Sequence, residues 1–178
     1  MFNKIFPKIH AEGYKFLVIA GIITIIFYIF SNFLALIGLL LTVWVYYFFR
    51  DPERVIINDD NYLVSPADGE VIKVEEVNGP KELGLENKNF KKISIFMNVF
   101  DCHVNRIPCS GKIEEILYKP GKFLNASFDK ASEDNERNYY KIKDQHGNDI
   151  VVVQIAGLVA RRIVCESNKD QDLKQGDR

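Results

Sequence analysis

The chain has 178 residues, of which 47% are hydrophobic, and its 23 Lys and Arg residues balance its 24 Asp and Glu residues to a net charge of −1. Charges of both signs are mixed without a basic stripe, which argues against a nucleic-acid-binding protein. The three cysteines, Cys102, Cys109 and Cys165, match neither the spacing of a zinc site nor the even count of a secreted disulfide framework, so reduced thiols are expected.

The first predicted element is an apolar region, 16–49, that carries no charged side chain. A single helix of about 34 residues would be about 51 Å long, well beyond the roughly 30 Å hydrocarbon core of a bilayer. Ser31 and Asn32 divide the region into 16–30 and 33–49, each near or below the minimum of about 17 residues for a span. Residues 1–50 are therefore interpreted as a membrane anchor, folded as a transmembrane or re-entrant helical hairpin.

Basic residues flank this region on both sides: Lys4, Lys8 and Lys15 before it, Arg50 and Arg54 after it. The positive-inside rule then places both ends in the cytoplasm, with the following domain on the cytoplasmic face of the cell (inner) membrane. The alternative is a single tilted span that ends at Phe49, which would place the termini on opposite sides. A signal peptide fits poorly, because the region is too long and no small-residue cleavage site follows it.

Residues 51–178 are predicted to form one mainly β domain with a modest core. Short runs rich in Val, Ile, Phe and Tyr alternate with Gly, Pro, Asn and Asp, as in a succession of strands and turns. The expected strands are 69–77, 92–98, 111–118, 138–143 and 148–156. The last two are joined by a hairpin loop at 144–148, where Gly147 is able to adopt a positive φ.

A weak internal echo runs through this domain. The pattern Pro66-x-x-Gly69-x-Val71-x-x-Val74 returns as Pro108-x-x-Gly111-x-Ile113-x-x-Ile116, with a turn leading into a strand each time. This spacing resembles the half-repeats of barrel-sandwich hybrid folds, which include lipoyl and biotinyl domains, so a barrel-sandwich-hybrid-like domain is expected. The tail 173–178 looks like a turn that opens another strand in such folds, and the domain is interpreted as incomplete at its C-terminus.

Four sequence blocks occur in order along the domain: Ser65-Pro66-Ala67-Asp68-Gly69, then 100–111, the dense polar segment 121–137, and 154–163. Together they resemble phosphatidylserine decarboxylases of the short bacterial and archaeal type (type A), and the resemblance covers most of the chain beyond Arg50. Such enzymes form a pyruvoyl group from a serine that follows a glycine. No Gly-Ser pair occurs here, so the chain resembles the large (β) subunit of such an enzyme.

The resemblance implies a reaction, a cofactor and partners. The pyruvoyl group would derive from a serine beyond Arg178 and would be carried by a small α subunit from the same precursor. With it, the enzyme would convert phosphatidylserine to phosphatidylethanolamine and carbon dioxide through a Schiff base. The chain alone is expected to be inactive. The phospholipid membrane is a further expected partner, and homo-oligomers are compatible with the resemblance.

Asp68 and His103 are the residues to which the resemblance assigns catalysis. By sequence alone, an Asp before Gly is usually a turn former, and a His at the end of a strand is usually structural. In larger relatives the corresponding Asp acts in self-cleavage with a His and the processed Ser. His103 follows the apolar run 93–100 and lies beside Asp101, where an imidazole with a pKa near neutrality is able to move protons.

The sequence departs from the larger relatives at Arg106, which stands where their His-x-x-His pattern has its second His. Arg cannot act as a general base at neutral pH because its pKa is too high. Self-cleavage would then depend on His103 or on backbone strain. Arg106 is instead expected to bind the substrate phosphate or carboxylate, with a surface salt bridge as the simpler alternative.

Asn125, Glu133 and Arg161 complete the expected substrate contacts. Asn125 and Glu133 belong to the polar loop 122–137, which without the resemblance would be interpreted as solvated. Arg161 and Arg162 are expected on a strand, where one side chain meets phosphate and the other points to solvent. A competing interpretation is a non-enzymatic, membrane-anchored binding or carrier module, because the triplet at 129–131 matches the lipoyl attachment site and would carry its cofactor on Lys130.

Overall fold

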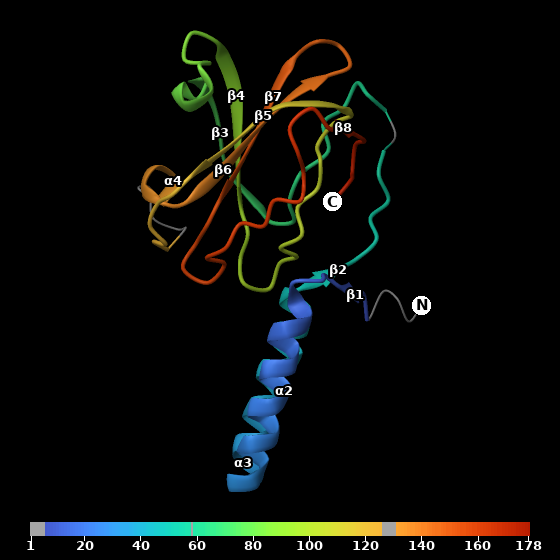
Figure 1. The fold of residues 1–178 in the computed structure, drawn as a ribbon, viewed down its shortest axis with the longest axis vertical. Helices are drawn as coiled ribbons and strands as arrows, with labels where there is room; N and C mark the ends of the chain where they lie inside the picture. The colour runs from blue at the N-terminus through green and yellow to red at the C-terminus, as the bar shows by residue number, and fades with distance from the viewer. Residues whose placement is uncertain (1–5, 58, 126–130) are drawn as a thin grey trace.

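The computed structural model describes residues 6–57, 59–125 and 131–178, and it consists of a helical pair that projects from one end of a mainly β domain (Figure 1). The helices are α2 (Gly13–Phe30), α3 (Asn32–Phe48) and the short α4 (Ala131–Asp134), with a 3-10 turn η1 (Lys81–Leu83). The strands are β1 (Lys8–Ile9), β2 (Arg50–Asp51), β3 (Glu70–Asn78), β4 (Asn89–Phe96), β5 (Gly111–Lys119), β6 (Arg137–Asp144), β7 (Asp149–Ile155) and β8 (Asp172–Leu173). They form three antiparallel sheets with the orders β1-β2, β3-β4 and β7-β6-β5-β8.

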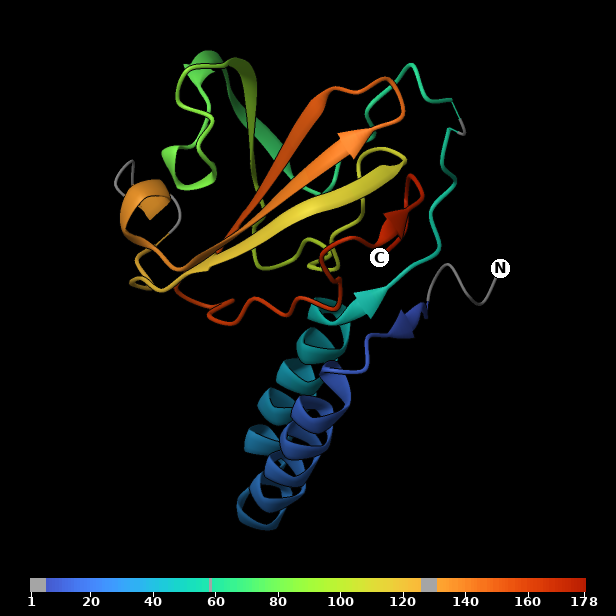
Figure 2. The same cartoon turned by 45° about the horizontal axis from the view of Figure 1, so that its top comes forward.

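The two predicted apolar helices are confirmed as an antiparallel pair, α2 and α3, which lie side by side along their length (Figure 2). Ser31 breaks the helix with an extended backbone, and its hydroxyl accepts a hydrogen bond from the Phe33 amide (3.2 Å). Gly38 allows close packing, since a Cβ there would lie 3.0 Å from the Cα of Thr24. α2 has 18 residues, about 27 Å of helix, and is long and apolar enough to span a membrane; α3 is slightly shorter.

Polar contacts at the base of the helical pair hold the N-terminal segment and the β domain in place. β1 pairs with β2, which sets the start of α2 against the end of α3. The Trp44 indole donates to the Val99 carbonyl (3.1 Å), and the Tyr46 hydroxyl donates to the Pro7 carbonyl (2.6 Å). The helices therefore have a defined position relative to the domain that follows them.

The sequence echo has a counterpart in the structure. The Val64 amide donates to the Pro108 carbonyl (2.9 Å), and the Arg106 amide donates to the Pro66 carbonyl (2.8 Å), so equivalent positions of the two copies bond reciprocally. Gly69 leads into β3 and Gly111 opens β5. Each glycine lies close to a backbone carbonyl of the partner strand. A Cβ at Gly69 would lie 2.4 Å from the Phe96 carbonyl oxygen, and a Cβ at Gly111 would lie 2.2 Å from the Lys143 carbonyl oxygen.

The strand irregularities repeat as well. The β3-β4 register shifts between Val71 and Lys73, and the β5-β6 register shifts between Ile113 and Glu115, three residues after the glycine in each copy. A bulge bends and twists a strand locally. The two halves of the domain therefore use the same turn, the same close approach and the same bend.

The core lies on both faces of the four-stranded sheet because its central strand β6 is buried on both sides. Consecutive side chains of a strand point to opposite faces, so Tyr139 and Tyr140 enter different clusters. Tyr140 packs with the fully buried Ile113 and Ile142, whereas Tyr139 packs with Leu83 and Leu85 of the segment around η1. The second cluster thus connects the four-stranded sheet to the β3-β4 hairpin connection.

All five expected strands are present, and the hairpin loop is confirmed: Gly147 has φ 82° and its amide donates to the Asp144 carbonyl (3.2 Å). The strand expected at Arg161 and Arg162 was wrong. Residues 157–161 turn on themselves, since the Gly157 amide bonds the Ala160 carbonyl (2.9 Å), and this backbone cannot extend alongside a neighbour. The tail was expected to be a turn that opens a strand. In the structure a short strand, β8, comes before the turn at 174–177 and pairs with Gly111 and Lys112.

Candidate functional site

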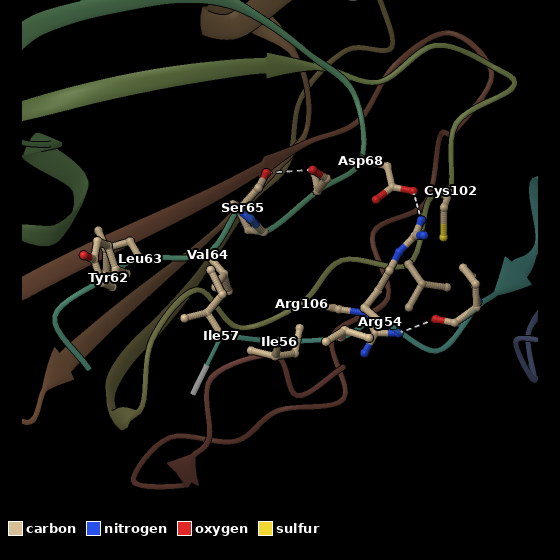
Figure 3. Close-up of a pocket in the computed structure, with 15 residues that line it drawn as sticks. Arg54, Ile56, Ile57, Tyr62, Leu63, Val64, Ser65, Asp68, Cys102 and Arg106 are labelled. Atoms are coloured by element: carbon tan, nitrogen blue, oxygen red, sulfur yellow. Dashed lines mark hydrogen bonds and ion pairs between the residues drawn. The ribbon is translucent and has the colours of Figure 1, made fainter. Parts of the chain in front are cut away.

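Asp68 lies at the rim of a cavity, on the segment that leads into β3 (Figure 3). The Ser65 hydroxyl donates to the Ala67 carbonyl (2.8 Å), which closes a tight bend just before Asp68. The Asp68 carboxylate forms an ion pair with the Arg54 guanidinium, and both side chains are partly exposed. Because this ion pair is partly exposed, a charged ligand could replace it with hydrogen bonds of its own to the guanidinium or the carboxylate.

The cavity has a volume of about 410 Å³, within the range of small-molecule sites. One side is apolar and comes from the segments 55–57 and 62–64. The polar side is formed by Arg54, Asp68 and Arg106, with Cys102 and Val104 between them. This lining suits a ligand with an anionic group and an apolar part.

Arg106 lines the cavity, but its guanidinium is held by the protein. It donates to the Asp51 carboxylate (3.2 Å), to the Pro52 carbonyl (2.8 Å) and to the Gly176 carbonyl (3.0 Å). Asp51 is buried and also accepts from Arg178 (2.5 Å). Arg106 therefore joins the segment after the anchor to the C-terminal tail, and a substrate anion would have to compete with Asp51 for it.

His103 lies at the junction between the β domain and the helices. Its ring stacks on Phe48 with the centroids 4.1 Å apart, and its Nδ1 is 3.1 Å from the Asp101 carbonyl. Because a carbonyl only accepts, Nδ1 carries the proton of the neutral ring and Nε2 is left with a lone pair. Burial lowers the pKa of His103 below 6.5, against the opposing effect of Asp101. The ring is therefore mainly neutral at pH 7 and able to accept a proton.

The three cysteines are free, as expected, and two of them are buried: Cys102 at the cavity and Cys109 in the core. The Cys102 thiol is buried and donates to the Arg50 carbonyl (3.1 Å). Burial raises the pKa of Cys102, and it raises the pKa of Cys109 to about 11. A thiolate nucleophile is disfavoured at both positions.

The polar loop is organised by a buried amide that the sequence did not single out. Asn135 is only 1% exposed, and its side chain bonds the Leu124 amide (2.8 Å), the Leu124 carbonyl (2.9 Å) and the Ala156 carbonyl (2.8 Å). The neighbouring Arg137 is buried and donates to the carbonyls of Glu133 and Asn135. These bonds fix both ends of the loop whose middle, including Lys130, lies outside the described residues.

The other expected substrate contacts lie apart from the cavity. Asn125 and Glu133 are exposed, the latter on α4, and Arg161 donates to the Leu158 carbonyl (2.9 Å). None of these three lines the cavity. The structure thus brings Asp68 and Arg106 together, adds Arg54 and Asp51, and keeps His103 on the adjoining helix junction. Arg54 was noted in the sequence only as a flanking charge, since nothing in its spacing indicates Asp68 as its partner.

Comparisons with known proteins identify the family of the chain. The family model described as phosphatidylserine decarboxylase matches residues 41–178, which contain every residue of the cavity. Among similar proteins, the phosphatidylserine decarboxylase proenzyme of Pelagibacter ubique (strain HTCC1062) is 76% identical over all 178 residues, which cover 83% of its own length.

Two more distant relatives carry the same name. The proenzyme of Ruegeria pomeroyi is 54% identical over 169 residues, which are 95% of this chain and 77% of the relative. That of Cereibacter sphaeroides is 48% identical over the whole chain and 77% of the relative. The matches run through the helices and the β domain alike. The chain therefore belongs to the phosphatidylserine decarboxylase family.

Proposed function

We propose that this chain is the large subunit of a phosphatidylserine decarboxylase, which converts phosphatidylserine to phosphatidylethanolamine and carbon dioxide. The observation that carries the proposal is the cavity that pairs Asp68 with Arg54 in a member of this family. A lipid head group with a phosphate, an amine and a carboxylate needs a positive partner, such as Arg54, and a negative partner, such as Asp68. The apolar side of the cavity suits the start of the glycerol and acyl region.

The proposal includes a pyruvoyl group on a small second subunit, formed from a serine beyond Arg178 when a precursor cleaves itself. The relatives' name, proenzyme, supports cleavage, and their greater length leaves room for such a subunit. Large apolar side chains of the β3-β4 sheet, such as Val71, Val74 and Ile93, are more than half exposed, and a second subunit would cover them. When bound, a pyruvoyl group supplies a carbonyl that takes up the substrate amine and withdraws electrons as the carboxyl group leaves.

The chain's own residues would bind the head group and move protons. Arg54, partly exposed at the cavity, would hold the phosphate or the carboxylate, and Arg106 would do so to the extent that it leaves Asp51. Asp68 would act in proton transfer during self-cleavage of the precursor. His103 would accept a proton at Nε2 from the ammonium group of the substrate and donate it to the carbon that loses carbon dioxide. Further contacts with the substrate would come from Asn125, Glu133 and Arg161.

Membrane attachment through α2 and α3 fits a substrate that stays in the bilayer. A helix of about 27 Å nearly matches the hydrocarbon core, and the basic residues that flank the helical pair at the start of α2 and after α3 favour a cytoplasmic β domain at the inner membrane. His103, which stacks on Phe48 at the end of α3, would then lie at head-group level.

The β domain would have the fold of a barrel-sandwich hybrid. The reciprocal bonds between positions 64–66 and 106–108, with the matching bulges in β3 and β5, support a barrel-sandwich hybrid built from two equivalent halves. In such a fold the cavity residues would lie where the two halves meet, since Asp68 and Arg106 belong to different copies.

The test is an assay of the protein produced from its complete gene, in detergent with phosphatidylserine. Release of carbon dioxide with equimolar phosphatidylethanolamine is expected, together with a strong loss of both in Arg54→Ala. An intact, folded protein that releases neither product, or that carries a lipoyl mass on Lys130, would overturn the proposal in favour of a carrier or binding module.

A further inference from the structure

The turn 98–101 at the base of the β domain presents a phenylalanine to solvent on a rigid backbone. The Asp101 amide donates to the Asn98 carbonyl (3.0 Å), the Asn98 amide donates to the Asp101 carboxylate (2.8 Å), and the Phe100 amide donates to the Asn98 side chain (2.8 Å). With its backbone fixed in this way, the turn cannot fold back to bury Phe100, whose side chain is 72% exposed.

The turn lies alongside the last turns of α3 and not beyond its end. The Trp44 indole donates to the Val99 carbonyl (3.1 Å), and the Arg50 guanidinium donates to the Phe100 carbonyl (2.9 Å). Trp44 lies four residues before the end of α3 at Phe48, and Arg50 lies two residues after it, in β2. The backbone of the turn therefore runs at the depth of the C-terminal end of α3.

The residues at this depth are those of a membrane interface. Trp and Tyr gather where hydrocarbon meets head groups, and Arg places its charge at the same level. Here the Arg50 guanidinium lies 6.0 Å from the centre of the Tyr47 ring, and Trp44 packs beside Phe48. Phe100 adds an exposed ring to this belt from the β domain.

A second segment at the same end of the domain has a similar character. The coil after β7 runs across the base of the β domain next to the helices (Figure 2), and Leu158 and Val159 are more than half exposed on it. Arg162 of this coil is 70% exposed and forms an ion pair with Glu12 near the start of α2 (3.5 Å). Apolar tips beside arginines are the composition that interfacial contacts require.

We propose that the turn 98–101 is a second membrane contact, in which the Phe100 side chain enters the boundary between head groups and acyl chains of a lipid bilayer. The inference rests on the membrane attachment included in the proposed function. It adds that the β domain is held at a fixed height by a contact of its own, two residues before Cys102, which bonds the Arg50 carbonyl, and three before His103, which stacks on Phe48. The partner is the bilayer, because the Val99 carbonyl of the turn accepts a hydrogen bond from Trp44 of α3, and many large apolar side chains of α2 and α3 are exposed.

The test measures the depth of position 100 in the full-length protein. Cys165→Ser removes the exposed native thiol, while the buried Cys102 and Cys109 remain. Phe100→Cys is then spin-labelled in vesicles of phosphatidylcholine and phosphatidylglycerol, with Tyr118→Cys on β5 as the matched exposed control. Collisions with oxygen report the bilayer, and collisions with a water-soluble nickel chelate report water. A label at 100 that oxygen reaches and nickel does not, with the reverse at 118, is the expected result.

The outcomes separate the inference from the proposed function. Nickel access at 100 equal to that at 118, in protein that floats with the vesicles, overturns the inference alone. Failure of the native protein to float overturns membrane attachment and the inference with it, whereas decarboxylation in detergent tests the enzyme independently. If Phe100→Cys does not fold, Phe100→Trp is used with lipids brominated on their acyl chains. Quenching beyond that of Trp44 in the native protein supports the inference, and the absence of additional quenching overturns it.

Discussion

The imidazole of His103 stacks on the ring of Phe48 with their centroids 4.1 Å apart and their planes at 26°. The residue proposed to move protons thus packs against the last residue of α3. The contact buries the ring and contributes to the low pKa of His103. The end of the anchor is therefore in direct contact with the proposed proton carrier.

This pair predicts the acid side of the pH profile. If neutral His103 is required, turnover is present above its pKa and is lost as the pH falls through a value below 6.5. Phe48→Ala admits water to the ring, and the pKa should rise toward 6.5, so the acid limb of kcat should move to higher pH. Phe33→Ala at the far end of the hairpin should leave the limb in place. An unchanged limb in Phe48→Ala would separate the anchor from the chemistry.

His103 itself should be required for decarboxylation. His103→Ala removes the proton carrier, and carbon dioxide release should fall by at least about a hundredfold. The protein should remain folded and soluble in detergent, as judged by its circular dichroism and elution volume. Near-normal turnover in this variant would show that the histidine is structural.

Asp68 is predicted to act in self-cleavage and not only in its turn. Asp68→Asn keeps the size of the side chain and its capacity to accept a hydrogen bond, but it removes the charge that pairs with Arg54. Conversion of the precursor into two chains, followed on denaturing gels, should slow by about a hundredfold or more. Asp59→Asn, in the exposed turn at 59–61, is the control. Normal conversion of Asp68→Asn would reduce Asp68 to a turn former.

Asn135 should be important for stability. Its truncation to Ala leaves three backbone groups of Leu124 and Ala156 without their partner, which should lower the free energy of unfolding by about 2–3 kcal/mol. Asn61→Ala, which removes an exposed amide, should change it by less than about 0.5 kcal/mol. Denaturant titration in detergent measures both, and equal effects would contradict the role of Asn135.

The close approach at Gly111 predicts a further loss of stability. A Cβ there would lie 2.2 Å from the Lys143 carbonyl, which belongs to the partner strand, so Gly111→Ala must separate β5 from β6. A cost of about 1–3 kcal/mol is expected. Gly21→Ala, where no atom lies within 4 Å, is the control and should be tolerated. A stable Gly111→Ala protein would argue against the shared turn of the two halves.

The strands were predictable because their signals are local. Runs of β-branched and aromatic residues between Gly, Pro, Asn and Asp indicated each one, and Ser31 indicated the break in the hairpin. The coil at Arg161 and Arg162 was not, since its apolar residues suggest a strand, whereas a tight turn at 157–160 removes it from the sheet.

The candidate site was only half predictable, for a different reason. Asp68, His103 and Arg106 were indicated by motifs, but their partners come from distant parts of the chain. Arg106 bonds the segment after the anchor and the C-terminal tail, which no spacing in the sequence connects. Asn135 was overlooked for the same reason, because it resembles any other polar residue of a loop until its burial is known.

The most direct test of the central claim is the denatured intact mass of the protein produced from its complete gene. A self-processed pyruvoyl decarboxylase predicts two chains: a large one that contains this sequence, and a small one whose first residue has the mass of a pyruvoyl group and is blocked to N-terminal sequencing. A single uncleaved chain in folded protein would contradict the account.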